Sequence, residues 1–356
     1  MKKVEIYPVT INEANENPAF SNIPAPVLKL ISLKNKKQSS IFLFSLSNAY
    51  VSPYGPVFKN GKVIEESVYK YSTKKKCNIF FSFCKKILKS KVRKIEGDCV
   101  VINHSWYHSY GHWLTEIIPR LFLVKEELSN KRLVIHKDLS RFHFEILSKF
   151  NFKEIIFVED DGIALCENIY FTSFPNYFIN QNIRIESQNI KTTELNINYS
   201  LMREMIQWFK SNNPLVKKHE AFGNNKIYIS RSKARHMKVI NEFELESILE
   251  PQGFIKVFLE DYSFDEQVQL LNSASIVISS HGSGLANVLF MQPEAYIINL
   301  ASNDHHDYFC LPLAGVANVK YCHINCTGEN LENPAYNNIT VDLNMLQQVF
   351  NSINNL

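Results

Sequence analysis

The chain has 356 residues, which is too long for one ordinary hydrophobic core and predicts two domains. Its hydrophobic content of 45% and charged content of 21% are those of a globular protein, which excludes the disordered and fibrous classes. The net charge of +4 comes from 39 basic and 35 acidic residues, and no recognition motif accompanies the basic ones, so nucleic acid is not expected as a partner.

The usual signals for secretion or membrane insertion are not recognisable in the sequence. The stretch Met1–Tyr7 contains no apolar core of signal-peptide length, and no later run approaches a membrane span. The seven cysteines include no Cys-x-x-Cys pair, so neither a zinc cluster nor a disulfide framework is indicated. We expect a cytoplasmic protein with reduced thiols.

The N-terminal half begins with short strands and continues with alternating strands and helices. Residues 1–70 alternate apolar and polar positions over short runs punctuated by proline. The basic stretch Lys74–Lys94 is either a solvated, partly helical face or a peripheral contact with an anionic membrane or polymer. From Tyr110 the apolar residues have helical spacing, and Pro119 is expected to kink that helix or end its first segment. Alternating strands and helices are then predicted at 133–135, 139–150, 155–158 and 165–172.

The second half predicts a doubly wound parallel sheet. The weakly periodic, Asn-rich stretch 173–196 is expected to connect the two domains. Beyond it, short links join strands to helices in a repeated order, which requires parallel strands. Strands are predicted at 226–230, 254–259, 276–278, 295–300 and 320–325, and helices at 199–211, 241–251, 264–272, 285–291, 307–314 and 343–350. Ligands bind beyond the carboxyl ends of such strands, so the residues that follow them should converge on one edge.

The sequence around His281–Gly284 predicts an anion-binding turn. The β-branched run Ile276–Ile278 precedes it, and apolar residues at helical spacing follow it. Strand, glycine turn and helix in that order direct backbone N–H groups and the positive end of a helix at one point, which favours phosphate. A tight turn without a ligand is the alternative. The residues expected to bind are His281, Gly282, Ser283, Gly284 and Asn287.

Charged residues after the neighbouring strands could complete this site. Arg231 and Arg235 come just after a strand, and guanidinium groups suit a pyrophosphate, although exposed loop arginines are the alternative interpretation. Glu260 follows another strand, where a carboxylate could accept the two ribose hydroxyls. Asn241 and Glu242 are expected to serve as the cap and first-turn anion of the next helix.

In the N-terminal half, His112 and Glu116 are four residues apart and share one face of the predicted helix. A carboxylate beside an imidazole is a workable general base with a tunable pKa. His104 and His108 lie nearby, so a metal site is an alternative, although a single helical His-x3-Glu is a weak metal signal. The segment Asp304–Asp307 also contains metal-ligand residue types, and we expect a polar loop with a helix cap there.

Two blocks of the sequence are similar to the signatures of glycosyltransferase family 61. The first is Tyr110-Gly-His-Trp-Leu-x-Glu-x-x-Pro-Arg120. The second runs from Ile229-Ser-Arg through Arg235, Asn241-Glu242, Glu260 and Gln267 to His281-Gly-Ser-Gly-Leu-Ala-Asn287 and Phe290-Met291. The resemblance covers roughly residues 98–301. Asn299 and Glu294 depart from it, because an acidic residue and a glycine are expected there.

The resemblance implies an α/β enzyme of GT-B-like architecture, with two Rossmann-like domains whose parallel sheets face a cleft. It implies inverting transfer from a nucleotide sugar, usually UDP-linked, to a glycan or lipid-linked glycan acceptor, without a metal or other cofactor. Bacterial members of this type build capsule or lipopolysaccharide, which fits the inner face of the cytoplasmic membrane. Glu116 would be the base, and His112 would orient it or contact the leaving phosphate. Arg231, Arg235 and the Gly282–Gly284 amides would neutralise the diphosphate, since the sequence has no Asp-x-Asp at a strand end.

We expect an acceptor-side domain at 1–195, with its histidine- and tryptophan-rich helix at 105–127, a nucleotide-sugar-binding domain at 196–335, and a closing helix at 336–356. Two other classes of protein fit parts of the sequence. A dinucleotide-dependent oxidoreductase would also place Gly-x-Gly after a strand, but the third glycine is absent and the turn lies late in the chain. A non-catalytic polysaccharide-binding or assembly protein could keep the same fold.

Overall fold

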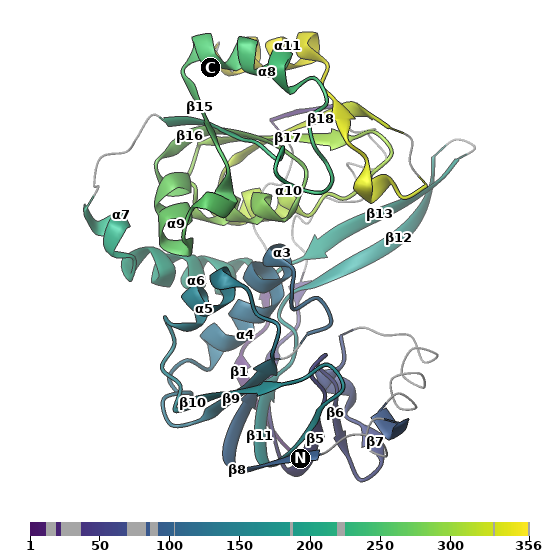
Figure 1. The fold of residues 1–356 in the computed structure, drawn as a ribbon, viewed down its shortest axis with the longest axis vertical. Helices are drawn as coiled ribbons and strands as arrows, with labels where there is room; N and C mark the ends of the chain where they lie inside the picture. The colour runs from purple at the N-terminus through teal and green to yellow at the C-terminus, as the bar shows by residue number, and fades with distance from the viewer. Residues whose placement is uncertain are drawn as a thin grey trace. The chain divides into compact units, whose positions relative to one another are not determined.

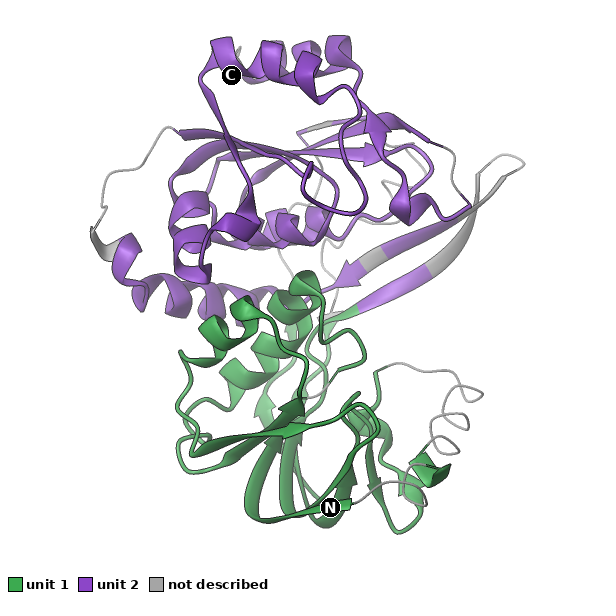
Figure 2. Cartoon of the chain, viewed as in Figure 1, with its two compact units in different colours: residues 1–10, 37–177 green, residues 11–36, 178–356 purple. Residues whose placement is uncertain are grey.

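The computed structural model describes residues 1–11, 19–22, 37–69, 83–85, 92–102, 104–185, 188–218, 225–329 and 332–354. Most of the basic stretch Lys74–Lys94, and with it the predicted membrane contact, lies outside the described residues. The chain divides into two compact units (Figure 2). Unit 1 comprises residues 1–10 and 37–177, and unit 2 comprises residues 11–36 and 178–356.

Unit 1 is built on a sheet whose strand order, in the part of the chain described, is β10-β9-β8-β11-β5-β6-β7, with β1 pairing with β5. Strands β10, β9, β8 and β11 are parallel, and the pairings beyond β11 are antiparallel. Leu133, Val134 and Ile135 of β9 are all buried, as expected for a parallel strand that is covered on both faces. The bounds are β1 (Lys2–Tyr7), β5 (Ile41–Val51), β6 (Val57–Lys59), β7 (Lys62–Val63), β8 (Val92–Val101), β9 (Arg132–His136), β10 (Glu154–Val158) and β11 (Ile163–Thr172). Two short strands, β2 (Thr10–Ile11) and β4 (Lys37–Gln38), lie near the unit boundary in sequence.

The helix predicted from Tyr110 is present, but its middle turn is wound differently from its ends. α3 (Tyr110–His112) leads into the π-helix η2 (Trp113–Ile117), which continues as α4 (Ile118–Leu123). Pro119 lies near the start of α4 but inside the continuous helix, where it cannot donate to the carbonyl of Thr115 four residues earlier. Unit 1 also contains α5 (Arg141–Leu147) and the 3-10 helix η1 (Glu65–Ser67).

Unit 2 contains a sheet of order β15-β14-β16-β17-β18-β19 within the described ranges, with β3 pairing with β18. All of these pairings are parallel except that of β19. Numbered along the chain, the first five strands have the order 2-1-3-4-5 of a doubly wound sheet, as the repeated strand–helix pattern predicts. The bounds are β3 (Phe20–Ser21), β14 (Asn225–Ile229), β15 (Phe254–Val257), β16 (Ala274–Ser280), β17 (Tyr296–Ser302), β18 (Lys320–Gly328) and β19 (Ile339–Thr340).

Helices cover both faces of the unit 2 sheet (Figure 1). On one face, Leu245 of α8 (Glu242–Leu249) and Phe350 of α11 (Leu343–Asn354) pack on the strands in one buried cluster. The closing helix predicted at 336–356 is therefore part of the unit 2 core. On the other face lie α6 (Tyr199–Ser211), α9 (Phe264–Asn272), α10 (Cys310–Ala317) and the 3-10 helix η5 (Ser283–Phe290), which pack together. Shorter helices are α7 (Pro214–Lys218), η3 (Glu250–Gln252), η4 (Leu259–Asp261) and η6 (Pro334–Tyr336).

The stretch 173–196, which is predicted to connect the two domains, contains the boundary between unit 1 and unit 2 at Tyr177, and it is folded rather than irregular. It forms β12 (Tyr177–Ile185) and β13 (Gln188–Asn196), which pair as a two-stranded sheet. Asn and Gln are frequent in both strands, so the apolar–polar alternation that identifies a half-buried strand is missing from the sequence. The expected pair of Rossmann-like domains facing a cleft stays a prediction, while the mixed α/β character with mainly parallel sheets is confirmed.

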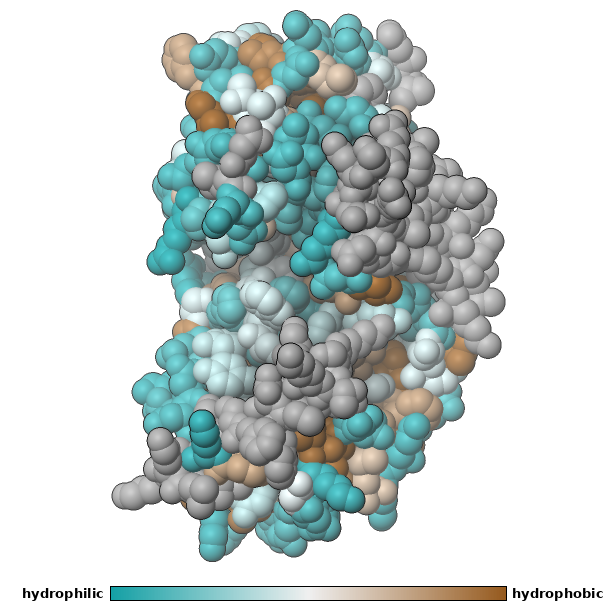
Figure 3. Space-filling view, turned by 90° about the vertical axis from the view of Figure 1, so that its right-hand side faces the viewer, coloured by the Kyte–Doolittle hydropathy of each residue, from teal (hydrophilic) through white to brown (hydrophobic). Residues whose placement is uncertain are grey.

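Among the described residues, no helix is both long enough and apolar enough to cross a membrane. On the face of the molecule seen in Figure 3, hydrophobic residues form separate small patches among hydrophilic ones. Single exposed apolar residues of this kind are normal for globular proteins.

Asn241 occupies the N-cap position of α8, as predicted, but its side chain makes no capping hydrogen bond. Instead, its Nδ2 donates to the carbonyl of Val341 at 3.0 Å, and its Oδ1 accepts from the Val341 N–H at 2.9 Å. The side chain thereby acts like one rung of a β-ladder and fixes the chain that enters α11.

We expect Asn241→Ala to lower the free energy of unfolding by about 1–3 kcal/mol, because the buried Val341 N–H and C=O both lose their partner. Chemical denaturation measures this change. Asn344→Ala, at an exposed position of α11, is the control. Equal stability losses in the two variants would show that the Asn241 bridge contributes nothing specific.

Candidate active site

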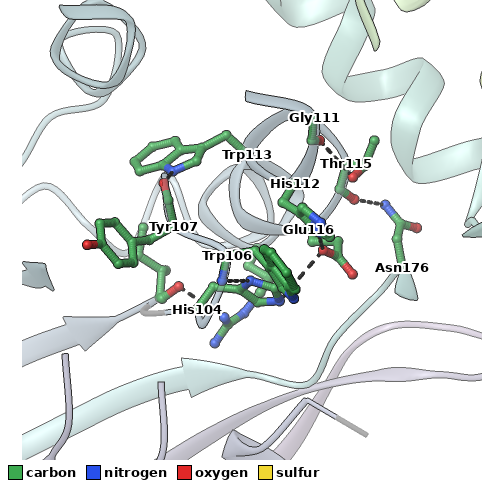
Figure 4. Close-up of polar contacts among 11 residues, drawn as sticks. His104, Trp106, Tyr107, Gly111, His112, Trp113, Thr115, Glu116 and Asn176 are labelled. Carbon is green, nitrogen blue, oxygen red and sulfur yellow. Dashed lines mark hydrogen bonds and ion pairs between the residues drawn. The ribbon is translucent and has the colours of Figure 1, made fainter. Parts of the chain in front are cut away.

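The helix that starts at Tyr110 carries the first cluster of functional side chains (Figure 4). The π-helical winding of η2 shifts the backbone partners of this turn, and Asn176 Nδ2 donates to the Thr115 carbonyl at 2.5 Å. Thr115 in turn donates its hydroxyl to the Gly111 carbonyl at 2.8 Å. Single π-helical turns occur frequently at functional sites, because they re-aim side chains that an α-helix would place elsewhere. Here the turn presents Glu116.

Glu116 is fully buried, and it lies between two imidazoles. Its Oε2 accepts a hydrogen bond from Nδ1 of His112 and lies 3.6 Å from Nε2 of His104. Its other oxygen, Oε1, has no hydrogen-bond partner among the described residues. A buried carboxylate is costly unless opposite charge or hydrogen-bond donors compensate it. We call these three residues the imidazole–carboxylate cluster.

Arg120, one turn further along the helix, supplies a compensating charge. Its guanidinium is buried and donates to the carbonyls of Ile102 and Val101 at 3.2 and 3.4 Å. Burial lowers the pKa of Arg120 to about 10, and the negative charge of Glu116 opposes that shift. Arg120 is the last residue of the first sequence motif, and no role is predicted for it from the sequence. Its signal was its position four residues after Glu116 on the same helix.

The tautomer of His104 follows from its backbone contact. Nδ1 of His104 accepts the Trp106 N–H at 3.1 Å, so the neutral ring carries its hydrogen on Nε2, which faces Glu116. Burial, with the nearby charges of His112 and Arg120, lowers the pKa of His104 well below its usual range and keeps the ring neutral.

Two histidines and one glutamate are a ligand set that zinc accepts. However, a ring nitrogen that carries hydrogen cannot bind a metal, so His104 does not fit a metal ligand in this arrangement.

His112 is the member of the cluster that solvent reaches. Its side chain is 20% exposed, whereas the side chains of Glu116 and His104 are 0% exposed. When Nδ1 donates to the Glu116 carboxylate, the lone pair of the neutral ring is on Nε2. This is the arrangement in which a carboxylate holds an imidazole in the tautomer of a general base.

A second cluster lies in unit 2, at the carboxyl ends of β14 and β16. These neighbouring strands flank the point where the order of the sheet reverses, which is where doubly wound sheets bind ligands. The guanidinium of Arg231 packs so closely on Gly282 that a Cβ at Gly282 would lie 2.4 Å from Nη1. Nη2 donates to the His236 carbonyl at 3.3 Å, and the buried Nε has no hydrogen-bond acceptor among the described residues. Burial lowers the pKa of Arg231, and the nearby Glu260 carboxylate opposes that shift. The structure thus brings Arg231, Glu260, His281 and Gly282 together, and we call them the strand-end cluster.

The other residues predicted for this site have different surroundings. Ser283 and Arg235 are exposed, and Gly284 lies where an added Cβ would be 3.0 Å from Leu259. Asn287 is fully buried and donates to Gln267 Oε1 at 3.0 Å. Gln267 in turn donates to the Leu259 carbonyl at 2.9 Å, so this pair ties η5 to η4. These contacts give Asn287 a supporting position, and its role in donor binding stays a prediction.

His281 has a carboxylate neighbour that our sequence analysis missed. Asp307 Oδ2 lies 3.7 Å from His281 Nε2 and 4.0 Å from His305 Nε2, while Asp307 Oδ1 accepts the Phe309 N–H at 3.1 Å. Asn299 Nδ2 faces His281 Nδ1 at 3.3 Å and donates to the Tyr321 hydroxyl at 2.9 Å. His281, His305 and Asp307 are again residue types that bind zinc. Because the Asn299 N–H occupies Nδ1, the hydrogen of His281 is on Nε2, and this contact opposes metal binding.

An arginine packed on a glycine turn in unit 2 is suited to phosphate recognition, and an imidazole–carboxylate pair in unit 1 is suited to acid–base chemistry. The family model described as Glycosyltransferase 61 matches residues 110–298, more than half of the chain, and this stretch contains His112, Glu116 and the whole strand-end cluster. The chain therefore belongs to glycosyltransferase family 61, and its class of reaction is sugar transfer from a donor to an acceptor. No curated protein matches the chain.

We expect Arg231→Ala to weaken UDP binding by about 1.5–3 kcal/mol, the scale of a hydrogen bond to a charged group, and to leave uridine binding nearly unchanged. Gly282→Ala should have the same effect, because its Cβ displaces the guanidinium. Calorimetry with both ligands measures these changes. Lys233→Ala, which removes an exposed cation of the same loop that pairs with Asp261, is the control. Equal losses for UDP and uridine would show that Arg231 is structural.

Proposed function

We propose that this protein is an inverting glycosyltransferase that uses the imidazole–carboxylate cluster as its general base. The observation that carries the proposal is the pairing of a partly exposed His112 with a fully buried Glu116. In an inverting displacement, the acceptor hydroxyl attacks the anomeric carbon while the bond from that carbon to the donor phosphate breaks. The hydroxyl proton goes to the base, and the electron pair of the broken bond leaves with the diphosphate.

The two members of the pair have different roles in this proposal. The sequence resemblance implies Glu116 as the base, with His112 orienting it or contacting the leaving phosphate. Burial favours the opposite division, because a completely buried carboxylate cannot reach an acceptor hydroxyl without rearrangement, whereas His112 is reached by solvent. Nε2 of His112 takes the proton, and Glu116 holds the ring and stabilises the imidazolium that forms. Arg120 keeps the buried Glu116 charge compensated.

On the donor side, we propose that the strand-end cluster binds the diphosphate of a nucleotide sugar. Arg231 supplies the charge that opposes the developing negative charge on the leaving group. Its buried Nε, which has no acceptor among the described residues, supports this assignment. The sequence has no Asp-x-Asp at a strand end to hold a cation, so we propose transfer without a metal ion. Ser283, Arg235 and Glu260 stay donor-binding candidates through their places at the strand ends.

The identity of the donor and acceptor, and the place of the reaction in the cell, are proposed from the sequence resemblance alone. It favours a UDP-linked donor, a glycan or lipid-linked glycan acceptor, and a place in bacterial capsule or lipopolysaccharide synthesis at the inner face of the cytoplasmic membrane. The alternative is a polysaccharide-binding protein that keeps the fold without catalysis. Thermal stabilisation by UDP or CMP favours the enzyme, since a ligand that binds the native state raises its stability.

We expect UDP release from UDP-sugars to continue in excess EDTA, because Arg231 takes the place of a cation at the diphosphate. A coupled assay for UDP measures this directly. If EDTA abolishes turnover and Mn²⁺ or Mg²⁺ restores it, the proposal that transfer needs no metal ion is wrong. The sugar-transfer class would stand in that case.

We expect His112→Gln to slow transfer by roughly 10²–10⁴-fold, the range for loss of a general base, with nearly normal UDP affinity. Glu116→Gln should slow it less, because the imidazole remains. Glu126→Gln, which removes an exposed carboxylate shortly after the same helix, is the control. If Glu116→Gln is the slower variant and His112→Gln retains most activity, the carboxylate itself is the base and the roles are reversed.

A further inference from the structure

Trp106 is a large apolar residue that the chemistry above does not use. Its side chain is 52% exposed, whereas Trp113 in the same region is completely buried. Its indole lies against the ring of His112, with ring centroids 5.5 Å apart and planes within 11° of parallel. Contacting rings lie roughly 3.5–4 Å apart, so a centroid distance of this size means an offset stack that leaves part of the imidazole uncovered. Figure 4 shows Trp106 beside His112 and Glu116.

Hydrogen bonds and a ring contact with buried residues hold the loop that carries Trp106. The Trp106 N–H donates to Nδ1 of His104 at 3.1 Å. The carbonyl of the next residue, Tyr107, accepts hydrogen bonds from the indole N–H of Trp113 and from Nε2 of His143, the latter at 2.9 Å. The Tyr107 ring also stacks on His136, with centroids 3.6 Å apart. The exposed indole is therefore a fixed part of the surface.

A flat, fixed and half-exposed indole next to a general base suits a sugar ring. One face of a pyranose presents C–H groups, which pack on an aromatic face, while the hydroxyls around its rim remain available for hydrogen bonding. The polar group of the cluster beside the indole is the imidazole of His112, because the side chains of His104 and Glu116 are 0% exposed and lie out of reach of a bound sugar.

We propose that Trp106 is the stacking platform of the acceptor subsite and that the acceptor is a pyranose of a glycan rather than a peptide hydroxyl. The proposal rests on the proposed function, because His112 is taken as the base that receives the acceptor proton. A sugar on the indole has its rim hydroxyls beside the partly uncovered imidazole. Trp106 then selects the acceptor by shape, without taking part in proton transfer.

Saturation-transfer NMR tests this with the purified protein. The probes are methyl β-D-galactopyranoside, methyl β-D-glucopyranoside and methyl α-D-mannopyranoside, with N-acetyl-threonine amide as the peptide probe. We expect at least one pyranoside to receive saturation on its C–H protons. Trp106→Ala should weaken its binding about three- to tenfold, the size of one aromatic contact, and Trp106→Phe should weaken it less. The UDP affinity of both variants should equal that of the wild type, which also shows that they are folded.

Phe144→Ala is the matched control, because Phe144 is another exposed aromatic of unit 1, at 46%, and packs on Phe157 of β10. His112→Gln should keep pyranoside binding even though it loses turnover, so a failure of the proposed base and a failure of the platform are distinguishable. Equal pyranoside binding by the wild type and Trp106→Ala overturns the platform. Trp106-dependent binding of the threonine probe alone overturns the carbohydrate acceptor.

Discussion

The buried carboxylate of Glu116 is the constraint on which the architecture of unit 1 depends. A carboxylate with no solvent contact is costly unless the protein surrounds it with donors and positive charge. The fold supplies these from one helix and the loop before it: His112 and Arg120 lie one turn on either side, and His104 comes from the loop. The π-helical turn is consistent with this demand, because a regular α-helix would not aim the Glu116 side chain in the same direction. Asn176 then satisfies the Thr115 carbonyl next to Glu116 in this turn.

Unit 2 contains a buried imidazole beside a carboxylate as well, with different residues. In each unit, an N–H group donates to Nδ1 of a buried imidazole: the Trp106 backbone to His104, and the Asn299 side chain to His281. Each contact puts the ring hydrogen on Nε2, where it faces Glu116 in one case and Asp307 in the other. An imidazole fixed in this way presents the N–H of Nε2 as a hydrogen-bond donor, which opposes metal binding at that nitrogen. In both sites, a hydrogen bond to Nδ1 thus turns the other ring nitrogen toward a carboxylate.

Sequence reasoning recovered features that depend on local pattern. The strand–helix order of unit 2, the helix from Tyr110 and the loop at Asp304–Asp307 all follow from apolar periodicity or from the chemistry of a few neighbouring residues. It failed where distant residues decide the outcome. Asn241 looks like a helix cap in sequence, but its partner is Val341, a hundred positions away. The burial of Glu116, which changes its expected role, depends on packing that no local pattern contains. The ribbon of β12 and β13 was missed because its strands lack apolar alternation.

Asn299 shows how a departure from a family pattern can be compensated. The resemblance predicted an acidic residue at this strand end, and an acid there would place a negative charge beside Nδ1 of His281 and draw the ring hydrogen to that side. With Asn299 the hydrogen is on the opposite nitrogen, and the carboxylate that meets it comes from Asp307 in the loop before α10. The imidazole therefore has one carboxylate neighbour, and this neighbour lies in a loop and not on the strand that carries Asn299. The loop is itself held in position, because Asp307 Oδ1 accepts the Phe309 N–H and Asp307 forms a β-bridge with Thr193. Asn299 and Asp307 together fix the His281 ring, one at each ring nitrogen.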